Sequence, residues 1–261
     1  MKLCFSTLGC CEKSREEIIE LCTRFGIFNL EIRGMGGVLD NRLIPDFTEK
    51  KIEETSKCFQ KAGVAPLIIG TSCSFHEAAG FDDAVSEGIA CAEIAERLGA
   101  SGIRVFGNNL GENPAESTAR VIDGIGRICE KSKIGGVDVL LEVHGDFNTV
   151  EALSPIVSAF KSEKNFGLIW DVCHTHKPYG DNWREFYNAF RPVIRHVHIK
   201  DIKADKLVLP GDGELLIKPI VAQMLADGYG GAFSLEWERK WHPELCEIEE
   251  AIAAFLRQLC I

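Results

Sequence analysis

The chain has 261 residues, of which 46% are hydrophobic and 26% are charged, and this composition is typical of a soluble globular protein with one large or two small domains. Its formal net charge is −10, which disfavours nucleic acid and anionic membranes as main partners, because both attract basic surfaces. No apolar run is long enough to span a membrane, and the N-terminus turns polar too soon for a signal peptide. We therefore expect a cytoplasmic protein that binds neither nucleic acid nor membranes. The eleven cysteines contain no CxxC pair, and we expect buried, reduced thiols.

Short apolar strands alternate with longer amphipathic helices along the whole chain. The expected strands are residues 2–8, 29–33, 64–70, 102–106, 137–143, 166–170, 194–199 and 232–237. The expected helices are residues 14–25, 48–62, 82–98, 114–131, 149–160, 183–190, 218–227 and 244–259. Several helix starts carry capping signals: Ser14 with Glu17 three residues later, Thr48, and Asn113 followed by Pro114.

This alternation predicts an α/β fold built from parallel βαβ units. Eight such units in about 250 residues are typical of a (β/α)8 TIM barrel, and we expect one barrel domain over residues 1–261. An open doubly wound sheet is the alternative. That fold usually has a glycine fingerprint after its first strand, and LGCCEK at residues 8–13 does not supply one.

Four consecutive strands end in residues that commonly bind metal ions, at the edge where barrel enzymes form their active sites. These residues are Glu142, Asp171, His198 and Glu236. A lone glutamate there is more often a salt-bridge partner, and a lone histidine is more often a core residue. Four in register on neighbouring strands favour one divalent metal ion. Three carboxylates and one imidazole suit Mn²⁺, Mg²⁺ or Co²⁺, and also admit Zn²⁺.

The segments LEVHG, WDVCHTH, HVHIKD and SLEWE occur in this order, with a GDGE loop at residues 211–214. Together they resemble the sugar phosphate isomerase/epimerase family of the xylose isomerase-like TIM barrel superfamily, over nearly the whole chain. The resemblance implies that the four residues above are the metal ligands and that Glu142 and Glu236 act as paired acid and base. It also implies that His174 touches the substrate, a small carbohydrate, and that the chain forms a homo-oligomer. The metal would stabilise a developing enediolate.

Further residues near the strand ends are candidates for binding substrate. Where ketose 3-epimerases of this fold carry an arginine after the metal-binding histidine, this chain has Lys200 and Lys203. Lys200 would bind a hydroxyl or a phosphate, with a surface or salt-bridged lysine as the alternative. His144 and His176 would line the rim, with solvated loop histidines as the alternative. Trp241 would form an apolar wall for a sugar, with packing as the alternative.

Three other residues carry structural expectations. His196 should lie one layer below His198 as a hydrogen-bonded core residue, because side chains two apart on a strand share a face. Trp237 should point into the helix layer. Trp183 is either a second wall for a sugar or a packing residue.

The expected function is therefore a metal-dependent sugar isomerase or epimerase. The same enediolate also supports a dehydratase acting on an inosose- or dehydroshikimate-like substrate. Apurinic endonucleases share the superfamily, but they need several metal ions, more histidines than the seven present here, and a basic face for DNA. A non-catalytic sugar-binding barrel would have no use for four intact metal ligands.

Overall fold

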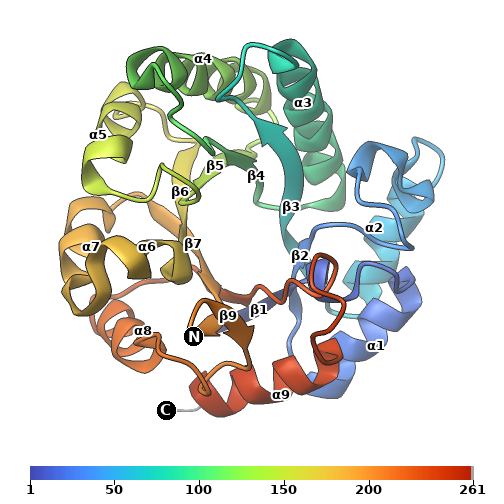
Figure 1. Ribbon diagram of the computed structural model, residues 1–261. Coiled ribbons are helices and arrows are strands. Elements are labelled where there is room, and N and C mark those ends of the chain that lie inside the picture. Colours follow the sequence, from blue (N-terminus) through green and yellow to red (C-terminus); the bar gives the residue numbers. More distant parts are fainter. Residues whose placement is uncertain (260–261) are drawn as a thin grey trace.

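Eight parallel strands close into a barrel at the centre of the computed structural model, which describes residues 1–259 (Figure 1). Each strand pairs with its neighbours in the sequence, and the last strand closes the barrel on the first. In chain order the strands are β1 (Lys2–Ser6), β2 (Asn29–Ile32), β3 (Ala65–Ser74), β4 (Gly102–Phe106), β5 (Asp138–Glu142), β6 (Phe166–Asp171), β7 (Ile194–Ile199) and β10 (Ala232–Leu235). The predicted (β/α)8 barrel is confirmed, and the open doubly wound sheet is excluded.

Helices form a ring around the barrel (Figure 1). They are α1 (Arg15–Phe25), α2 (Ile52–Lys61), α3 (Phe81–Leu98), α4 (Pro114–Ser132), α5 (Val150–Ala159), α6 (Val172–Tyr179), α7 (Arg184–Phe190), α8 (Ile217–Ala226) and α9 (Ile248–Leu259). Ser14 and Glu17 form the expected capping box on α1, and the Asn113 side chain accepts a hydrogen bond at the start of α4. A short antiparallel hairpin of β8 (Asp201–Lys203) and β9 (Lys206–Val208) follows β7.

The apolar core has two parts, because alternate side chains of each strand point to opposite faces. Most buried apolar side chains lie between the strands and the helix ring. A separate small cluster of Ile68, Leu140 and Ile169 fills the inside of the barrel. Glu142 lies two residues beyond Leu140, and Asp171 lies two residues beyond Ile169. Both carboxylates therefore point into the barrel, next to this apolar cluster and on its side toward the carboxyl ends of the strands.

Some predicted helix boundaries are wrong. Thr48 does not cap a helix: its hydroxyl donates to the carbonyl of Pro45, and α2 begins only at Ile52, after a short 3₁₀ turn. The last helix begins at Ile248 rather than at residue 244.

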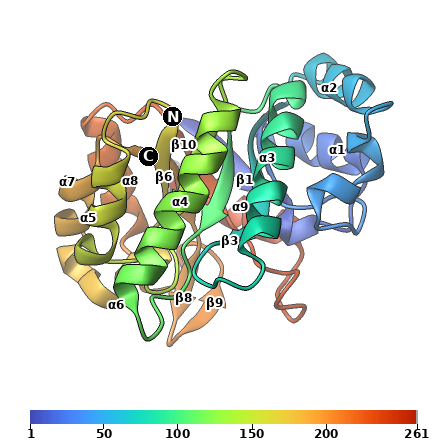
Figure 2. The same ribbon diagram turned by 90° about the horizontal axis from the view of Figure 1, so that it is seen from above.

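The sequence analysis also missed α6 and the β8–β9 hairpin. Helix α6 begins directly after β6, where Asp171 accepts hydrogen bonds from the backbone N–H groups of Cys173 and His174. Figure 2 shows the hairpin at one end of the barrel and the N-terminus toward the other. The hairpin follows the end of β7, so it extends from the end where a (β/α)8 barrel places its active site.

The structure also tests two expectations from composition, which concern membrane-spanning helices and the state of the cysteines. No helix within residues 1–259 is both long and apolar enough to cross a bilayer. The ten cysteines in this range are free thiols, and most are buried. Burial raises the pKa of such thiols, for example to about 12 for Cys22, so they remain protonated and unreactive.

Candidate metal centre and substrate cavity

The four side chains expected to bind a metal lie together at the ends of their strands. Glu142 and Asp171 are the last residues of β5 and β6, and His198 is the last but one of β7. Glu236 follows β10, and its backbone N–H donates to the carbonyl of Ile199 at 3.0 Å, which continues the strand pairing. One possible ligand atom from each of the four lies within 4.8 Å of those of the other three.

The chemistry of these atoms fits a divalent cation. All four residues are buried, and three of them carry a buried polar atom that makes no hydrogen bond. These atoms are Glu142 Oε2, Asp171 Oδ2 and His198 Nδ1. The partners of the two carboxylate oxygens are the ion-pair residues Arg104, Lys200 and His174. Buried oxygen and nitrogen donors that face one another without hydrogen bonds are suited to a bound ion.

His198 is oriented by Glu31, which lies on β2. Its Nε2 is 2.9 Å from Glu31 Oε2, while its Nδ1 is 3.5 Å from Glu236 Oε2 and 3.7 Å from Glu142 Oε1. A carboxylate that holds the far nitrogen of a ligating histidine is a common arrangement around metal ions. Burial lowers the pKa of His198, but the three surrounding carboxylates outweigh it and raise the pKa well above its ordinary value. A binding cation would therefore displace a proton from this imidazole.

Glu31 holds a second histidine as well. His196 Nε2 lies 3.2 Å from Glu31 Oε2, and the Ser234 hydroxyl donates to the same oxygen at 3.2 Å. His196 is thus the hydrogen-bonded core residue that the sequence predicted. Burial alone would raise the pKa of Glu31, but its two histidine neighbours lower it overall, so Glu31 stays ionised.

Lys200 is a buried lysine in the middle of the acidic residues. Its Nζ lies 2.8 Å from Asp171 Oδ2 and 2.8 Å from Glu236 Oε2, and it also contacts Glu238. Burial lowers the pKa of Lys200, but these carboxylates raise it well above its ordinary value, so the ammonium group is retained. The surface alternative is therefore wrong, and Lys200 is a salt-bridged lysine with three carboxylate partners, two of which belong to the candidate metal centre.

Arg104 on β4 is a second buried cation, which the sequence analysis missed. Its Nη1 lies 3.2 Å from Glu142 Oε2 and 3.3 Å from Glu236 Oε1, and its guanidinium stacks 4.4 Å from the centre of the Phe106 ring. Burial lowers the pKa of Arg104, but the carboxylates raise it overall. Arg104 therefore connects the two glutamates for which paired acid and base roles are expected.

Glu31, Arg33 and Arg104 share a sequence signal that was available. Each is a charged residue flanked by apolar ones in LEIR or GIRVF, at the middle or end of a buried strand. Since the outer face of such a strand packs against helices, a charge there has to point into the barrel. The prediction from the sequence rested on metal-ligand residue types at the strand ends, which Glu31, Arg33 and Arg104 do not complete, so these three charges were overlooked.

A cavity of about 320 Å³ opens directly above this cluster. Its lining comprises Leu8, Arg33, Ser72, Arg104, Phe106, Asn108, Glu142, His144, Lys200, Glu236, Glu238 and Trp241. A neighbouring cavity of about 560 Å³ shares His144, Lys200 and Glu238 with it and is lined by His174 as well. Together they have the volume of a small-molecule site.

The remaining candidates separate into two groups. Trp241 is 52% exposed and lines the cavity, and the ring centres of His144 and His174 lie 4.3 Å apart at its edge. His176 is half-buried on α6 and lines neither cavity. Trp183 is buried against Trp170 in the helix layer, so it packs and does not form a wall of the cavity.

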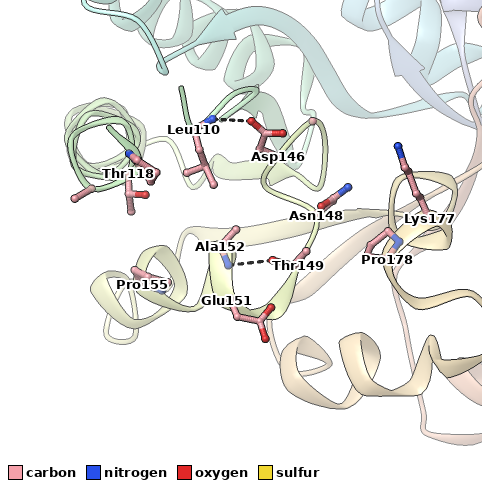
Figure 3. A pocket seen from close by; sticks show the side chains of 13 residues that line it. Leu110, Thr118, Asp146, Asn148, Thr149, Glu151, Ala152, Pro155, Lys177 and Pro178 are labelled. Atoms are coloured by element: carbon pink, nitrogen blue, oxygen red, sulfur yellow. Dashed lines mark hydrogen bonds between the residues drawn. The ribbon is translucent and has the colours of Figure 1, made fainter. Parts of the chain in front are cut away.

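A more voluminous groove, drawn in Figure 3, is lined by other residues than the four candidate ligands. It measures about 1070 Å³ and lies between α4 and α5, with Lys177 and Pro178 of α6 at one side. Its polar groups serve local structure: Asp146 accepts from the N–H of Leu110, and Thr149 accepts from that of Ala152. None of the four candidate ligands lines it, so its size does not identify it as the site.

Residues 19–259 match the family described as xylose isomerase-like TIM barrel. The chain belongs to this family. A curated relative, an inosose dehydratase from Geobacillus thermodenitrificans (strain NG80-2), is 26% identical over 164 residues. The match covers 54% of each protein, so the chain spans about half the length of the curated relative that it matches.

Solved structures with the same fold are similar over almost the whole chain. One is the probable 3-DHS dehydratase AsbF of Bacillus anthracis, with a TM-score of 0.81, 18% identity, and coverage of 100% of this chain and 99% of that chain. Another is the IOLI protein with a bound zinc atom, with a TM-score of 0.80, 23% identity, and coverage of 99% and 96%. A third is D-psicose 3-epimerase from Clostridium cellulolyticum H10, with a TM-score of 0.78, 17% identity, and coverage of 99% and 98%. At these identities the similarity shows the fold alone.

Proposed function

We propose that this chain is a divalent-metal-dependent enzyme that transfers protons at a carbon beside the carbonyl group of a sugar or polyol, as an isomerase or epimerase. Glu142, Asp171, His198 and Glu236 would hold one Mn²⁺, Mg²⁺ or Co²⁺ ion, or Zn²⁺ as in the zinc-bound IOLI protein. The observation that carries the proposal is the convergence of these four buried donors at the floor of a small-molecule cavity. When bound, the ion would stabilise negative charge on the substrate oxygens.

Glu142 and Glu236 would remove and return the proton. Both line the cavity, and both are within 3.3 Å of the Arg104 guanidinium. Burial raises the pKa of Glu142, but Arg104 outweighs it, so the pKa is lowered overall and the carboxylate is ionised at neutral pH. Lys200 and His198 lower the pKa of Glu236 in the same way, against the effect of burial. Both glutamates are therefore ionised, which is the state that the one acting as base requires. The one acting as acid would first take up a proton from solvent and then return it to the substrate.

A dehydratase is the second candidate, because the curated relative and one of the similar structures are described as dehydratases. It would begin with the same proton removal and continue with loss of a hydroxyl group from the neighbouring carbon. The glutamate that removed the proton would pass it to the departing hydroxyl, which leaves as water. His144 and Lys200 border both cavities and carry N–H groups that would hydrogen bond to this hydroxyl. The two candidates thus share a site and differ in the fate of one hydroxyl group.

Proton NMR in D₂O distinguishes these reactions. The metal-loaded protein is incubated with a panel of free and phosphorylated sugars, an inosose and dehydroshikimate. We expect deuterium to enter a carbon beside the carbonyl of at least one of them. Label with inversion marks an epimerase, a moved carbonyl marks an isomerase, and a lost hydroxyl marks a dehydratase. Metal-loaded protein that exchanges no proton with any of these compounds would contradict the proposed proton transfer.

A further inference from the structure

The cavity contains a buried cation that has no anionic partner within ion-pair distance. Arg33 directly follows β2, is only 7% exposed and lines the cavity. Within residues 1–259, no carboxylate oxygen lies within 4.0 Å of its guanidinium, whereas the Arg104 guanidinium has three such partners. Glu87 attracts Arg33 only from beyond that distance. Buried arginines are normally paired, so this exception calls for a functional explanation.

Most of the hydrogen-bonding capacity of Arg33 is unused. Its Nη1 donates to the carbonyl of Leu39 at 3.0 Å, and its Nη2 donates to the Ser72 hydroxyl at 2.9 Å. A guanidinium has five N–H donors, so three remain without an acceptor among the described residues. Burial and repulsion by Arg104 lower the pKa of Arg33 to about 10, which still leaves it charged at neutral pH. The side chain thus presents a full positive charge and free donors to the cavity.

Gly70 makes room for this arrangement. A Cβ atom at that position would lie 2.8 Å from Arg33 Cδ and 3.5 Å from Arg104 Nη2. The missing side chain therefore lets the two arginines lie next to each other. Neutral polar groups surround the remaining space, since Ser72 and Asn108 also line the cavity. Asn108 is held at a φ of 59°, which side chains other than glycine seldom adopt, and its amide donates to Ser74.

We propose that the substrate carries an oxyanion, a carboxylate or a phosphate, which Arg33 binds while the rest of the molecule reaches Glu142 and Glu236. This inference rests on the proposed function and narrows its substrate class to acidic or phosphorylated sugars and polyols. A guanidinium matches both oxyanions, because its parallel N–H groups donate to two oxygens at once. Arg104 does not serve this purpose, since Glu142 and Glu236 already neutralise it.

Three probes that differ at one carbon test the proposal: D-glucose, D-glucuronate and D-glucose 6-phosphate. Their affinities for the Mn²⁺-loaded protein are measured by calorimetry, with saturation-transfer NMR for weak binding. We expect at least one anionic probe to bind about tenfold or more tightly than glucose. The preferred probe distinguishes a carboxylate from a phosphate site. Equal affinities for all three, or binding by neither anion, would overturn the proposal.

Matched variants assign the preference to Arg33. Arg33→Gln should remove the preference for the anionic probe over glucose. Lys133→Gln changes the net charge equally on an exposed residue just after α4, and it should have no effect. If Arg33→Gln does not fold, Arg33→Lys replaces it. This variant keeps the positive charge but lacks the planar guanidinium with its parallel N–H donors, so it should reduce the preference for the anion. A preference that is undiminished in either folded Arg33 variant would overturn the proposal.

The two proposals fail separately. An anion preference that depends on Arg33, without any deuterium exchange, would reject the proposed reaction and retain the anion site. Deuterium exchange on a neutral sugar, with no preference for either anion, would reject the anion site and retain the proposed reaction.

Discussion

The two sides of the barrel mouth have opposite charge. Strands β5, β6, β7 and β10 bring three carboxylates and an imidazole within 4.8 Å of one another. Strands β2 and β4 bring Arg33 and Arg104 together above Gly70. On the acidic side Glu142 Oε2 and Asp171 Oδ2 are acceptors that make no hydrogen bond, and on the basic side Arg33 has donors that make none. Under the two proposals, the barrel mouth would bind a metal cation on the acidic side and an anionic group of the substrate on the basic side.

The largest expected effect follows from removing a charge on the acidic side. Glu142→Gln should lower the rate of deuterium exchange by about 10²–10⁴-fold, because the amide cannot accept the proton. Glu20→Gln changes an exposed carboxylate on α1 that lines neither cavity and should leave the rate within about twofold, since surface changes are usually mild. Equal losses in both variants would show that Glu142 has no special role.

Lys200→Met tests how the acidic side is held together without metal. The change leaves Asp171 and Glu236 without their shared cation, so the metal-free protein should lose about 3–5 kcal/mol of unfolding free energy. Saturating Mn²⁺ should recover more stability in the variant than in the wild type, because the ion replaces the missing charge. Urea unfolding with EDTA and with Mn²⁺ measures both. The same recovery in both proteins would contradict a metal site at these carboxylates.

Glu31→Gln tests the carboxylate that lies behind His198. The pKa of Glu31 is lowered in the folded protein below its ordinary value of 4.5, so its charge stabilises the fold above that pH. The variant should lose about 3 kcal/mol at pH 7. The difference from wild type should shrink as the pH falls below 4.5, where the unfolded chain gains a proton. Urea unfolding across this pH range measures the effect, with the exposed Glu20→Gln as control. A difference in unfolding free energy between wild type and Glu31→Gln that stays constant with pH would refute the account.

Gly70→Ala should have the smallest effect, on the basic side. The added methyl group would displace Arg33, and overpacking of this kind costs about 1–3 kcal/mol. It should also weaken the preference for anionic probes. Gly230→Ala is the matched control, because a Cβ there would meet nothing within 4 Å. Thermal unfolding gives the melting temperatures of the two variants. Equal melting temperatures would show that the Arg33 side chain shifts away from the added methyl group without a cost in stability.

The acidic side was predictable from the sequence, and the basic side was not predicted. Parallel strands all end at one rim, so the polar residues that end β5 and β6 had to meet there. Arg33 and Arg104 carry the weaker signal of a charge among apolar neighbours, which says that a side chain points inward but not what it contacts. The burial of Lys200 depends on carboxylates from other strands, which local sequence does not reveal.

Two local features were missed for similar reasons. Helix α6 begins where Asp171 both ends a strand and caps a helix, and the sequence analysis considered only the first role. The β8–β9 hairpin precedes a loop that is held by Asp201, whose side chain accepts from the N–H groups of Gly211, Gly213 and Leu215. That contact joins residues ten and more positions apart, beyond the reach of local propensity.

The metal content of the purified protein tests the central claim most directly. Wild type, Asp171→Asn and Glu244→Gln are loaded with Mn²⁺ or Zn²⁺, desalted and analysed by mass spectrometry for bound metal. The account predicts about one ion per chain in wild type and Glu244→Gln, and a large loss in Asp171→Asn, whose buried oxygen has no hydrogen bond in the structure. Wild type that holds no metal under any loading condition, or Asp171→Asn that retains it in full, would contradict the account.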